Sequence, residues 1–359
     1  LLGYRGLDDI VRNTRVEFAT APTSLTASSG RYRIALEPAA ASEVQVSFSC
    51  DVGQRTPAIL PYDEAFSVNE RALGRYKSST CRVLSSNEQF DDWTNRSVAD
   101  LFMLVSDTRD GPYPYAGVPW FSTVFGRDGI ITAFECLWAQ PALARGVLAH
   151  LAATQATGSD AARDAEPGKI LHERRDGEMA GLGEIPFGRY YGTVDATPLF
   201  VMLADAYYER TADREFLDSI WPNIEGALLW IDTHGDLDGD GFVEYERRRE
   251  SGLINQGWKD SEDSVFHADG TLAEAPIALA EVQGYVYAAK TGAARLLRIR
   301  GDIERADALS ADAERLKDRF DESFFCEELG TYALALDGDK RTCRVRSSNA
   351  GHCLWTGIA

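Results

Sequence analysis

The spacing of the hydrophobic residues changes near residue 80, and this change most limits how the chain can fold. Before it, apolar and polar residues alternate between positions 44 and 50 and again between 32 and 36. A period of two is typical of strands with one buried face. Together with Val16 and Phe18, this pattern predicts an antiparallel sheet up to about residue 65, as a portion of a β-sandwich.

After residue 80 the period is helical. Ser85 and Glu88 form a capping-box pattern that predicts a helix start, with the helix running through Phe102. Pro198 and Pro276 are expected in the first turns of two later helices, where the missing N–H is harmless. Further helices are predicted at about 126–139, 141–156, 195–210, 213–233, 276–299 and 302–320. We expect these helices to pack side by side as hairpins.

Composition excludes several classes of partner. The 359 residues, 44% of them hydrophobic, are enough for two domains or one large one. The net charge of -19 disfavours nucleic acid and an anionic membrane surface as partners. No apolar run reaches the roughly 18 residues of a membrane span, and the first residues lack the layout of a secretory signal. We therefore expect a cytoplasmic protein.

The loop from Pro119 to Asp128 carries residue types suited to holding a sugar ring. Trp120, Phe121 and Phe125 offer aromatic faces to the C–H surface of a pyranose, and Arg127 and Asp128 offer donors and acceptors to its hydroxyls. In the alternative interpretation, Phe125 belongs to the core and Arg127 and Asp128 form an ion pair at a helix start. The neighbouring aromatic residues favour sugar binding.

Two long irregular stretches, at about 157–194 and 234–275, are candidates for the chemistry, because long loops in compact domains are usually functional. In the second stretch, Asp260 follows Trp258. A general acid must stay neutral near pH 7, and an apolar wall such as Trp258 raises a carboxyl pKa by desolvation. We predict Asp260 as this acid; the alternative is a solvated acidic turn.

The first stretch ends in a second candidate sugar-contacting loop, from Gly183 to Gly192. Glu184 and Tyr191 supply a carboxylate and an aromatic ring, and Asp195 follows directly. The alternative is a surface loop in which Asp195 is only a helix N-cap. Glu281, near the start of a later helix, is expected to face a central cavity. We expect the segments around positions 120, 190 and 260 to converge on one hollow.

The segment from Asp236 to Glu244 matches the first half of a calcium loop, with acids at alternate positions followed by glycine. The position of the closing bidentate glutamate is occupied by Arg247. Two interpretations stay open, a metal-free Asp-Gly turn and a partial calcium site. The ligands of such a calcium site would be Asp236, Asp238, Asp240 and Glu244. No nucleotide-binding pattern occurs, and no organic cofactor is expected.

Four segments together resemble the bacterial amylo-alpha-1,6-glucosidase, or glycogen debranching, family. They are Phe125–Asp128, Tyr191–Pro198, Asn255–Ser261 and Ser348–His352. The resemblance covers nearly the whole chain and implies a mainly α fold, an (α/α)6-type toroid that is incomplete in this chain. It makes residues 1–80 the C-terminal portion of an N-terminal β-sandwich domain plus a connector. Residues 81–359 would be the first part of the catalytic toroid.

The same resemblance implies an inverting, exo-acting glycoside hydrolase that releases glucose from α-1,6 or other α-glucosidic ends of glycogen-like oligosaccharides. Arg127 and Asp128 would grip the outer hydroxyls of the terminal glucose, Asp260 would be the general acid, and Lys259 would contact a sugar hydroxyl. The residues expected to line the pocket are Trp120, Phe121, Tyr191, Asp195, Trp258 and Glu281. The general base is expected beyond residue 359, so the chain alone is not expected to turn over.

Other classes remain as alternatives. A non-catalytic carbohydrate-binding or scaffolding protein would use the same aromatic residues but needs no shielded acid. A related toroid glycosidase with another sugar specificity, trehalase-like or mannosylglycerate hydrolase-like, would share the motifs. A helical-barrel isoprenoid cyclase needs an Asp-rich metal box on a helix, whereas Asp236 to Asp240 lie in a Gly-rich turn. The favoured partner is an oligosaccharide or polysaccharide substrate.

Overall fold

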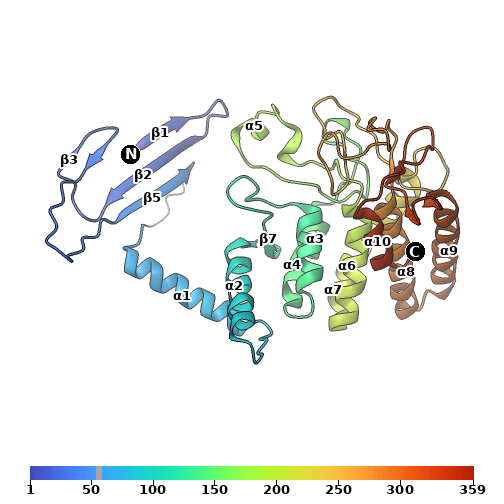
Figure 1. Cartoon of the computed structure of the whole chain (residues 1–359), viewed down its shortest axis with the longest axis horizontal. Coiled ribbons are helices and arrows are strands. Elements are labelled where there is room, and N and C mark those ends of the chain that lie inside the picture. Colours follow the sequence, from blue (N-terminus) through green and yellow to red (C-terminus); the bar gives the residue numbers. More distant parts are fainter. Residues whose placement is uncertain (54–58) are drawn as a thin grey trace. The chain divides into compact units, whose positions relative to one another are not determined.

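The computed structural model describes residues 1–53 and 59–359, which divide into two compact units (Figure 1). The smaller unit contains Leu1–Ser79 and Gly177–Glu184, and the larger contains Thr80–Asp176 and Ile185–Ala359. The fold is mainly helical, with 45% of residues in helices and several small antiparallel sheets. None of the described helices is both long and apolar enough to cross a lipid bilayer.

The smaller unit contains a three-stranded antiparallel sheet in the order β1-β2-β5 and a separate hairpin, β3-β4. Its elements are β1 (Leu2–Arg5), β2 (Val11–Phe18), β3 (Ser24–Leu25), β4 (Gly30–Arg31), β5 (Val46–Val52), α1 (Tyr62–Ser78) and the short α5 (Glu178–Gly181). The expected strand at 32–36 is wrong, because no strand is present between residues 32 and 45. The segment expected to be a plain connector contains α1.

The predicted buried face of β5 is also wrong. Val16 pairs with Phe48 across β2 and β5, so the strand itself is confirmed. However, the Phe48 side chain is 71% exposed, whereas Ser49 and Asp51 on the opposite face are buried. A period of two identifies residues that share a face, but it does not say which face another layer covers. A complete β-sandwich here therefore stays a prediction.

The larger unit holds the helices that the sequence predicts. They are α2 (Glu88–Leu104), α3 (Gly126–Cys136), α4 (Pro141–Thr154), α6 (Ala196–Thr211), α7 (Arg214–Trp230), α8 (Ala280–Arg300), α9 (Ile303–Phe324) and α10 (Asn349–Thr356). Six of the helices from α2 to α9 begin within three residues of the expected positions. The exception is α8, which begins four residues late, because residues 278–279 form a strand before it. The last helix, α10, was not predicted.

Short strands and turns connect these helices. They are β6 (Val105–Thr108), β7 (Gly111–Pro114), β8 (Ala278–Leu279), β9 (Phe325–Cys326), β10 (Thr331–Tyr332), β11 (Ala335–Leu336), η1 (Ala161–Arg163), η2 (Pro186–Gly188) and η3 (Ile231–Gly235). The pairing of β8 with β11 explains why Pro276 precedes α8 rather than lying in its first turn. The N-cap of α2 is Asn87, whose side chain accepts a hydrogen bond from the Phe90 N–H, so the predicted cap at Ser85 is wrong.

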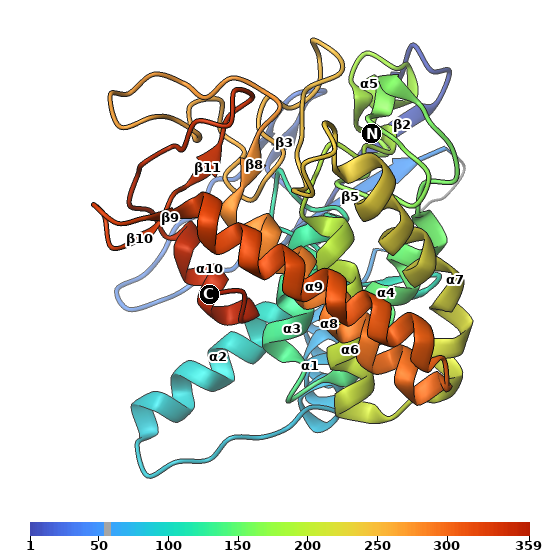
Figure 2. The ribbon, with the colours of Figure 1, turned by 90° about the vertical axis from the view of Figure 1, so that its right-hand side faces the viewer.

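The helices of the larger unit pack as antiparallel hairpins, α3 with α4, α6 with α7 and α8 with α9 (Figures 1 and 2). The first helices of these hairpins also pack on one another, α3 on α6 and α6 on α8, and the single helix α10 packs on α8. Gly292 allows α8 to approach α6 closely, because a Cβ at this position would lie 2.8 Å from the Asp205 carboxylate of α6. The row α3-α6-α8-α10 places the N-terminal ends of these helices next to one another.

Candidate functional site

The N-terminal ends of these four helices carry the candidate site. Arg127 and Asp128 lie in the first turn of α3, and Asp195 directly precedes α6. Glu281 lies in the first turn of α8, and Asn349 is the first residue of α10. The positive end of a helix dipole stabilises nearby carboxylates, so this arrangement suits a cluster of acidic groups.

Close packing at the start of α3 requires glycine. A Cβ on Gly126 would lie 1.9 Å from the carbonyl oxygen of Leu171 and 3.5 Å from the Cβ of Ala196. The Gly126 N–H donates a hydrogen bond of 2.8 Å to the carbonyl oxygen of His172. The start of α3 is therefore fixed against both the 171–173 segment and the start of α6.

The guanidinium of Arg127 joins three segments that are remote in the sequence. It donates to the Asp195 carboxylate at 3.0 Å and to the Gly257 carbonyl oxygen at 2.8 Å. Its second terminal nitrogen lies 3.4 Å from the Asp260 carboxylate. The Asp195 side chain is fully buried, and it also accepts a hydrogen bond from the Thr193 hydroxyl. The structure thus brings the segments near residues 127, 195 and 260 together around one cation.

Several nearby carboxylates stabilise the positive charge of Arg127. Burial lowers the pKa of Arg127, but Asp195 and Asp128 raise it by more, so the net direction is upward. Burial raises the pKa of Asp128, and the charge of Arg127 offsets part of this rise. Within the described part of the chain, the ion pairs of Arg127 are with Asp195 and Asp260 rather than with its sequence neighbour Asp128. Asp128 therefore remains available to a ligand.

Glu173 is a further acidic residue at this site that sequence reasoning missed. It is buried, and its carboxylate accepts a hydrogen bond of 2.8 Å from Arg175. Burial raises its pKa, Arg175 lowers it, and the charges of Asp260 and Asp128 raise it again. The backbone of Glu173 forms isolated β-bridges with Phe125 and with Tyr190. The hydrophobic pattern of the sequence does not indicate these bridges, because Glu173 lies in an irregular segment.

Glu281 is the most perturbed carboxyl group of the site. It is buried, and neither of its carboxylate oxygens has a hydrogen-bond partner among the described residues. Burial raises its pKa to about 7, and the neighbouring Asn349 amide offsets part of the rise. A Cβ on Gly257 would lie 3.7 Å from its Oε1, so the turn that binds Arg127 also passes Glu281. A carboxyl group with this pKa exchanges its proton near neutral pH.

The raised pKa predicts a pH-dependent effect of Glu281→Gln on the free energy of unfolding. The folded state binds this proton more tightly than the unfolded state, so the group costs stability as pH rises from about 4.5 to 7. Above this window the ionised, buried carboxylate costs about 3 kcal/mol. We expect urea unfolding to show Glu281→Gln more stable than wild type by about this amount at pH 8, and nearly equal at pH 4.

The matched control is Glu322→Gln, which changes an exposed carboxylate on α9. Its effect is expected to be small and similar at both pH values. If the Glu281→Gln difference were the same at pH 4 and pH 8, a raised pKa at Glu281 would be contradicted.

The predicted aromatic residues fall into exposed and buried groups. Trp120 and Phe121 are 78% and 53% exposed, so both side chains are accessible to a ligand. Phe125 is buried, with its ring 5.7 Å from that of His172. Tyr191 is buried as well, and its hydroxyl donates to the Thr154 carbonyl oxygen at 2.7 Å. Direct sugar contact by Phe125 and Tyr191 stays a prediction.

Trp258 and Lys259 lie beside α10. The Trp258 ring stacks on His352 with the ring centroids 5.6 Å apart, and the buried Trp258 Nε1 has no hydrogen-bond partner among the described residues. His352 in turn shares a hydrogen bond of 2.6 Å with the Tyr285 hydroxyl. The Lys259 ammonium lies 5.0 Å from the centroid of the Trp258 ring. His352 and Asn349 belong to the Ser348–His352 motif. The helix α10, which the sequence did not predict, places them at the site.

Glu184 belongs to the smaller unit, where it is exposed, and its predicted sugar contact stays a prediction. The four predicted calcium ligands lie between residues 236 and 244, directly after η3.

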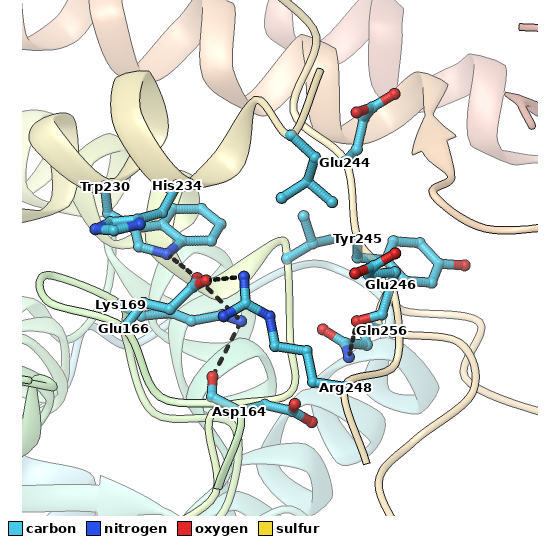
Figure 3. Close-up of a pocket in the computed structure, with 12 residues that line it drawn as sticks. Asp164, Glu166, Lys169, Trp230, His234, Glu244, Tyr245, Glu246, Arg248 and Gln256 are labelled. Atoms are coloured by element: carbon cyan, nitrogen blue, oxygen red, sulfur yellow. Dashed lines mark hydrogen bonds and ion pairs between the residues drawn. The ribbon is translucent and has the colours of Figure 1, made fainter. Parts of the chain in front are cut away.

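A polar pocket is lined by residues from the first and second irregular stretches (Figure 3). Glu166 is buried there, and its carboxylate accepts a hydrogen bond of 2.7 Å from the Trp230 indole and pairs with Arg248. Lys169 lies 3.8 Å from the same carboxylate and donates to the Asp164 carbonyl oxygen. Burial lowers the pKa of Lys169, and Glu166 and Asp164 raise it. This network ties the two stretches together, because Glu166 of the first stretch pairs with Arg248 of the second.

Comparisons with known proteins give a likeness of fold. No protein-family model matches the sequence, and no curated protein matches it. The structure is similar to that of a sialidase, with a TM-score of 0.54 and 12% sequence identity over 93% of this chain and 30% of the sialidase. A rhamnosidase of family GH78 from Bacillus sp. GL1 aligns with a TM-score of 0.38 and 18% identity, over 48% of this chain and 16% of the rhamnosidase.

The fold of the chain therefore resembles the part of the sialidase structure with which it aligns. The chain spans less than a third of the length of either matched structure. At these levels of identity the likeness concerns the fold alone, so the chemistry has to be argued from the residues.

Proposed function

We propose that this chain carries part of the active site of an inverting, exo-acting glycoside hydrolase that releases glucose from α-1,6 or other α-glucosidic ends. The observation that carries the proposal is the contact of Arg127 with Asp195, Gly257 and Asp260. A buried cation among carboxylates suits the hydroxyls of a neutral polyhydroxylated ligand, and the exposed rings of Trp120 and Phe121, a few residues before Arg127, suit its apolar face. The α-1,6 preference rests on the motif resemblance.

We also propose that the row α3-α6-α8-α10 is the inner layer of an α/α toroid, with α4, α7 and α9 outside it. Each inner helix is followed by an antiparallel partner, except α10, and the inner helices pack on their neighbours. In this arrangement the N-terminal ends of the inner helices surround one substrate. The domain boundary would fall near residue 80, with a β-sandwich portion before it and the catalytic toroid after it.

In the proposed reaction, Asp260 protonates the glycosidic oxygen. Its carboxylate is about half exposed, so the apolar shield expected from Trp258 is wrong, and the Trp258 ring stacks on His352 instead. The exposure leaves Asp260 accessible to a substrate, and Arg127 lies 3.4 Å from its carboxylate. Arg127 and Asp128 would bind the outer hydroxyls of the terminal glucose, and Trp120 and Phe121 would cover its apolar face. Glu281 would accept or donate a hydrogen bond at the bottom of the site, because its two oxygens have no partner among the described residues. A carboxylate on the far side of the sugar would activate the water.

The test is hydrolysis of a panel of α-linked glucosides by a protein that contains this chain, with the anomer of the first released sugar followed by NMR. We expect glucose to appear in the β form, because an inverting enzyme reverses the anomeric configuration. Release of α-glucose would contradict the inverting mechanism. Binding of the sugars without hydrolysis would favour the non-catalytic alternative, in which Asp260 has no acid role.

A further inference from the structure

The loop between Asp236 and Glu244 is folded around its own acidic side chains. The two carboxylate oxygens of Asp236 accept hydrogen bonds from the N–H groups of Gly239, at 2.7 Å, and Gly241, at 2.9 Å. Both glycines adopt positive φ values, of 82° and 84°, which glycine tolerates without strain. The loop therefore turns tightly enough to bring acids that alternate in the sequence to one point.

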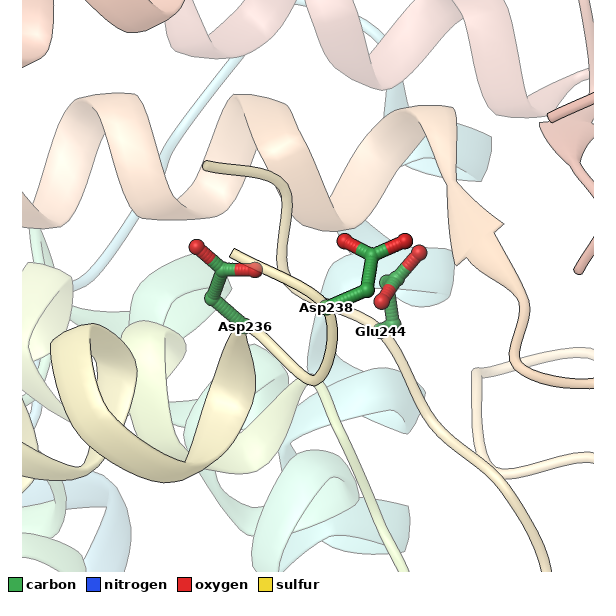
Figure 4. Close-up of side chains that lie close together, drawn as sticks. All are labelled: Asp236, Asp238 and Glu244. Carbon is green, nitrogen blue, oxygen red and sulfur yellow. The ribbon is translucent and has the colours of Figure 1, made fainter. Parts of the chain in front are cut away.

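The carboxylates at this point are spaced for a cation. One oxygen each of Asp236, Asp238 and Glu244 lie within 4.8 Å of one another (Figure 4). Calcium binds oxygen ligands at about 2.3 to 2.6 Å, so oxygens on opposite sides of the ion are about 5 Å apart. The observed spacing is compatible with a shared calcium ion.

A cation from the protein itself already lies among these carboxylates. The Lys340 ammonium lies 2.8 Å from the Asp238 carboxylate and 2.6 Å from that of Asp240, and it also pairs with Glu244. Lys340 lies in a turn with a positive φ of 60°, an uncommon conformation for a residue with a side chain. One ammonium group among four carboxylates leaves the cluster acidic.

The burial of Glu244 is a second observation, independent of the spacing of the carboxylates. Its side chain is fully buried, yet its Oε2 has no hydrogen-bond partner among the described residues. An unpaired, buried carboxylate oxygen is costly, and Lys340 reaches only the other oxygen of this group. Glu244 and Leu237 also line the polar pocket of Figure 3.

We propose that the 236–244 loop is a calcium site at which the Lys340 ammonium competes with the calcium ion for the same carboxylates. The ion would bind Asp236, Asp238, Asp240 and Glu244 and would displace the Lys340 ammonium. Calcium suits this set better than magnesium, because it accepts a flexible shell of carboxylates, whereas magnesium demands near-ideal octahedral geometry. Binding would release Lys340 and thereby free the turn from 337 to 341 from the loop.

The experiment is calorimetric titration of the chain with calcium chloride, with magnesium chloride in parallel. Wild type is expected to bind calcium with a dissociation constant of roughly 10⁻⁴ to 10⁻³ M, and magnesium more weakly. Lys340→Met, which removes the competitor, is expected to bind calcium at least about tenfold more tightly. Asp238→Asn is expected to lose binding. The matched controls are Lys290→Met, which breaks a pair with Asp232 elsewhere, and Asp269→Asn, which changes a different Asp turn.

Thermal unfolding of the wild type keeps the proposal testable if Lys340→Met fails to fold. Calcium is expected to raise the unfolding temperature of wild type, whereas Asp238→Asn should show no rise. A wild type with neither heat of binding nor a temperature shift would overturn the calcium site. Lys340→Met that binds calcium no more tightly than wild type would overturn the competition.

Discussion

Replacing Arg127 with methionine is expected to cost about 3 to 5 kcal/mol of the free energy of unfolding. The Asp195 side chain is fully buried and has Arg127 as its ion-pair partner, so the substitution leaves a buried charge uncompensated. Asp128 and Asp260 would also lose the cation that offsets their mutual repulsion. The change removes the hydrogen bond to the Gly257 carbonyl oxygen as well. Urea unfolding at pH 7 measures the loss.

Two comparisons separate the buried charge from a general effect of losing arginine. Arg174→Met breaks an exposed pair with Asp176 and is expected to cost less than about 1 kcal/mol. In a background that already carries Asp195→Asn, Arg127→Met is expected to cost clearly less than in wild type. A loss below about 1 kcal/mol in wild type would contradict the role of Arg127 as the partner of Asp195.

In a catalytically active protein that contains this chain, Asp260→Asn is expected to lower kcat by about 10² to 10⁴ and to change KM little. Asparagine keeps the size and a hydrogen-bonding oxygen for Arg127 but cannot donate a proton to the leaving oxygen. Substrates with a good leaving group, such as an aryl glucoside, need less protonation, so their kcat should fall less. Steady-state kinetics with an aryl and an alkyl glucoside measure both effects.

Asp263→Asn is the matched control, because Asp263 is an exposed carboxylate in the same irregular stretch. Its kcat is expected to stay close to that of wild type. An Asp260→Asn protein with nearly full activity toward both substrates would remove Asp260 as the acid. If Glu281→Gln alone abolished activity, the acid role would move to Glu281, whose pKa of about 7 suits it.

The helical half of the fold was predictable because its signals are local. Helix starts such as those of α4 and α9 follow from hydrophobic period and capping residues within the same few turns. The wrong predictions lie where contacts between distant segments determine the local structure. Residues 278–279 pair with β11, more than fifty residues later, and so delay α8. The exposed Phe48 depends on which layer covers the sheet, and a single strand carries no information about this.

The candidate site was predictable only in part. Motifs indicated Arg127, Asp195 and Asp260, and the structure places these residues in contact. Glu173 gave no sequence signal, because it lies in an irregular segment and reaches the site through backbone bridges to Phe125 and Tyr190. Lys340 was missed for a related reason. Its partner loop ends almost a hundred residues earlier, and no spacing rule connects them.

The proposed function requires that the residues around Arg127 bind the terminal glucose of an α-linked substrate. A crystal structure of the chain soaked with isomaltose tests this most directly, with Arg127→Met crystals as the control. We expect one glucose ring within hydrogen-bond distance of Arg127, Asp128 and Asp260, with an aromatic face from the loop at Trp120, and no sugar in the Arg127→Met crystals. Isomaltose bound only elsewhere, or bound equally in both crystals, would contradict the account.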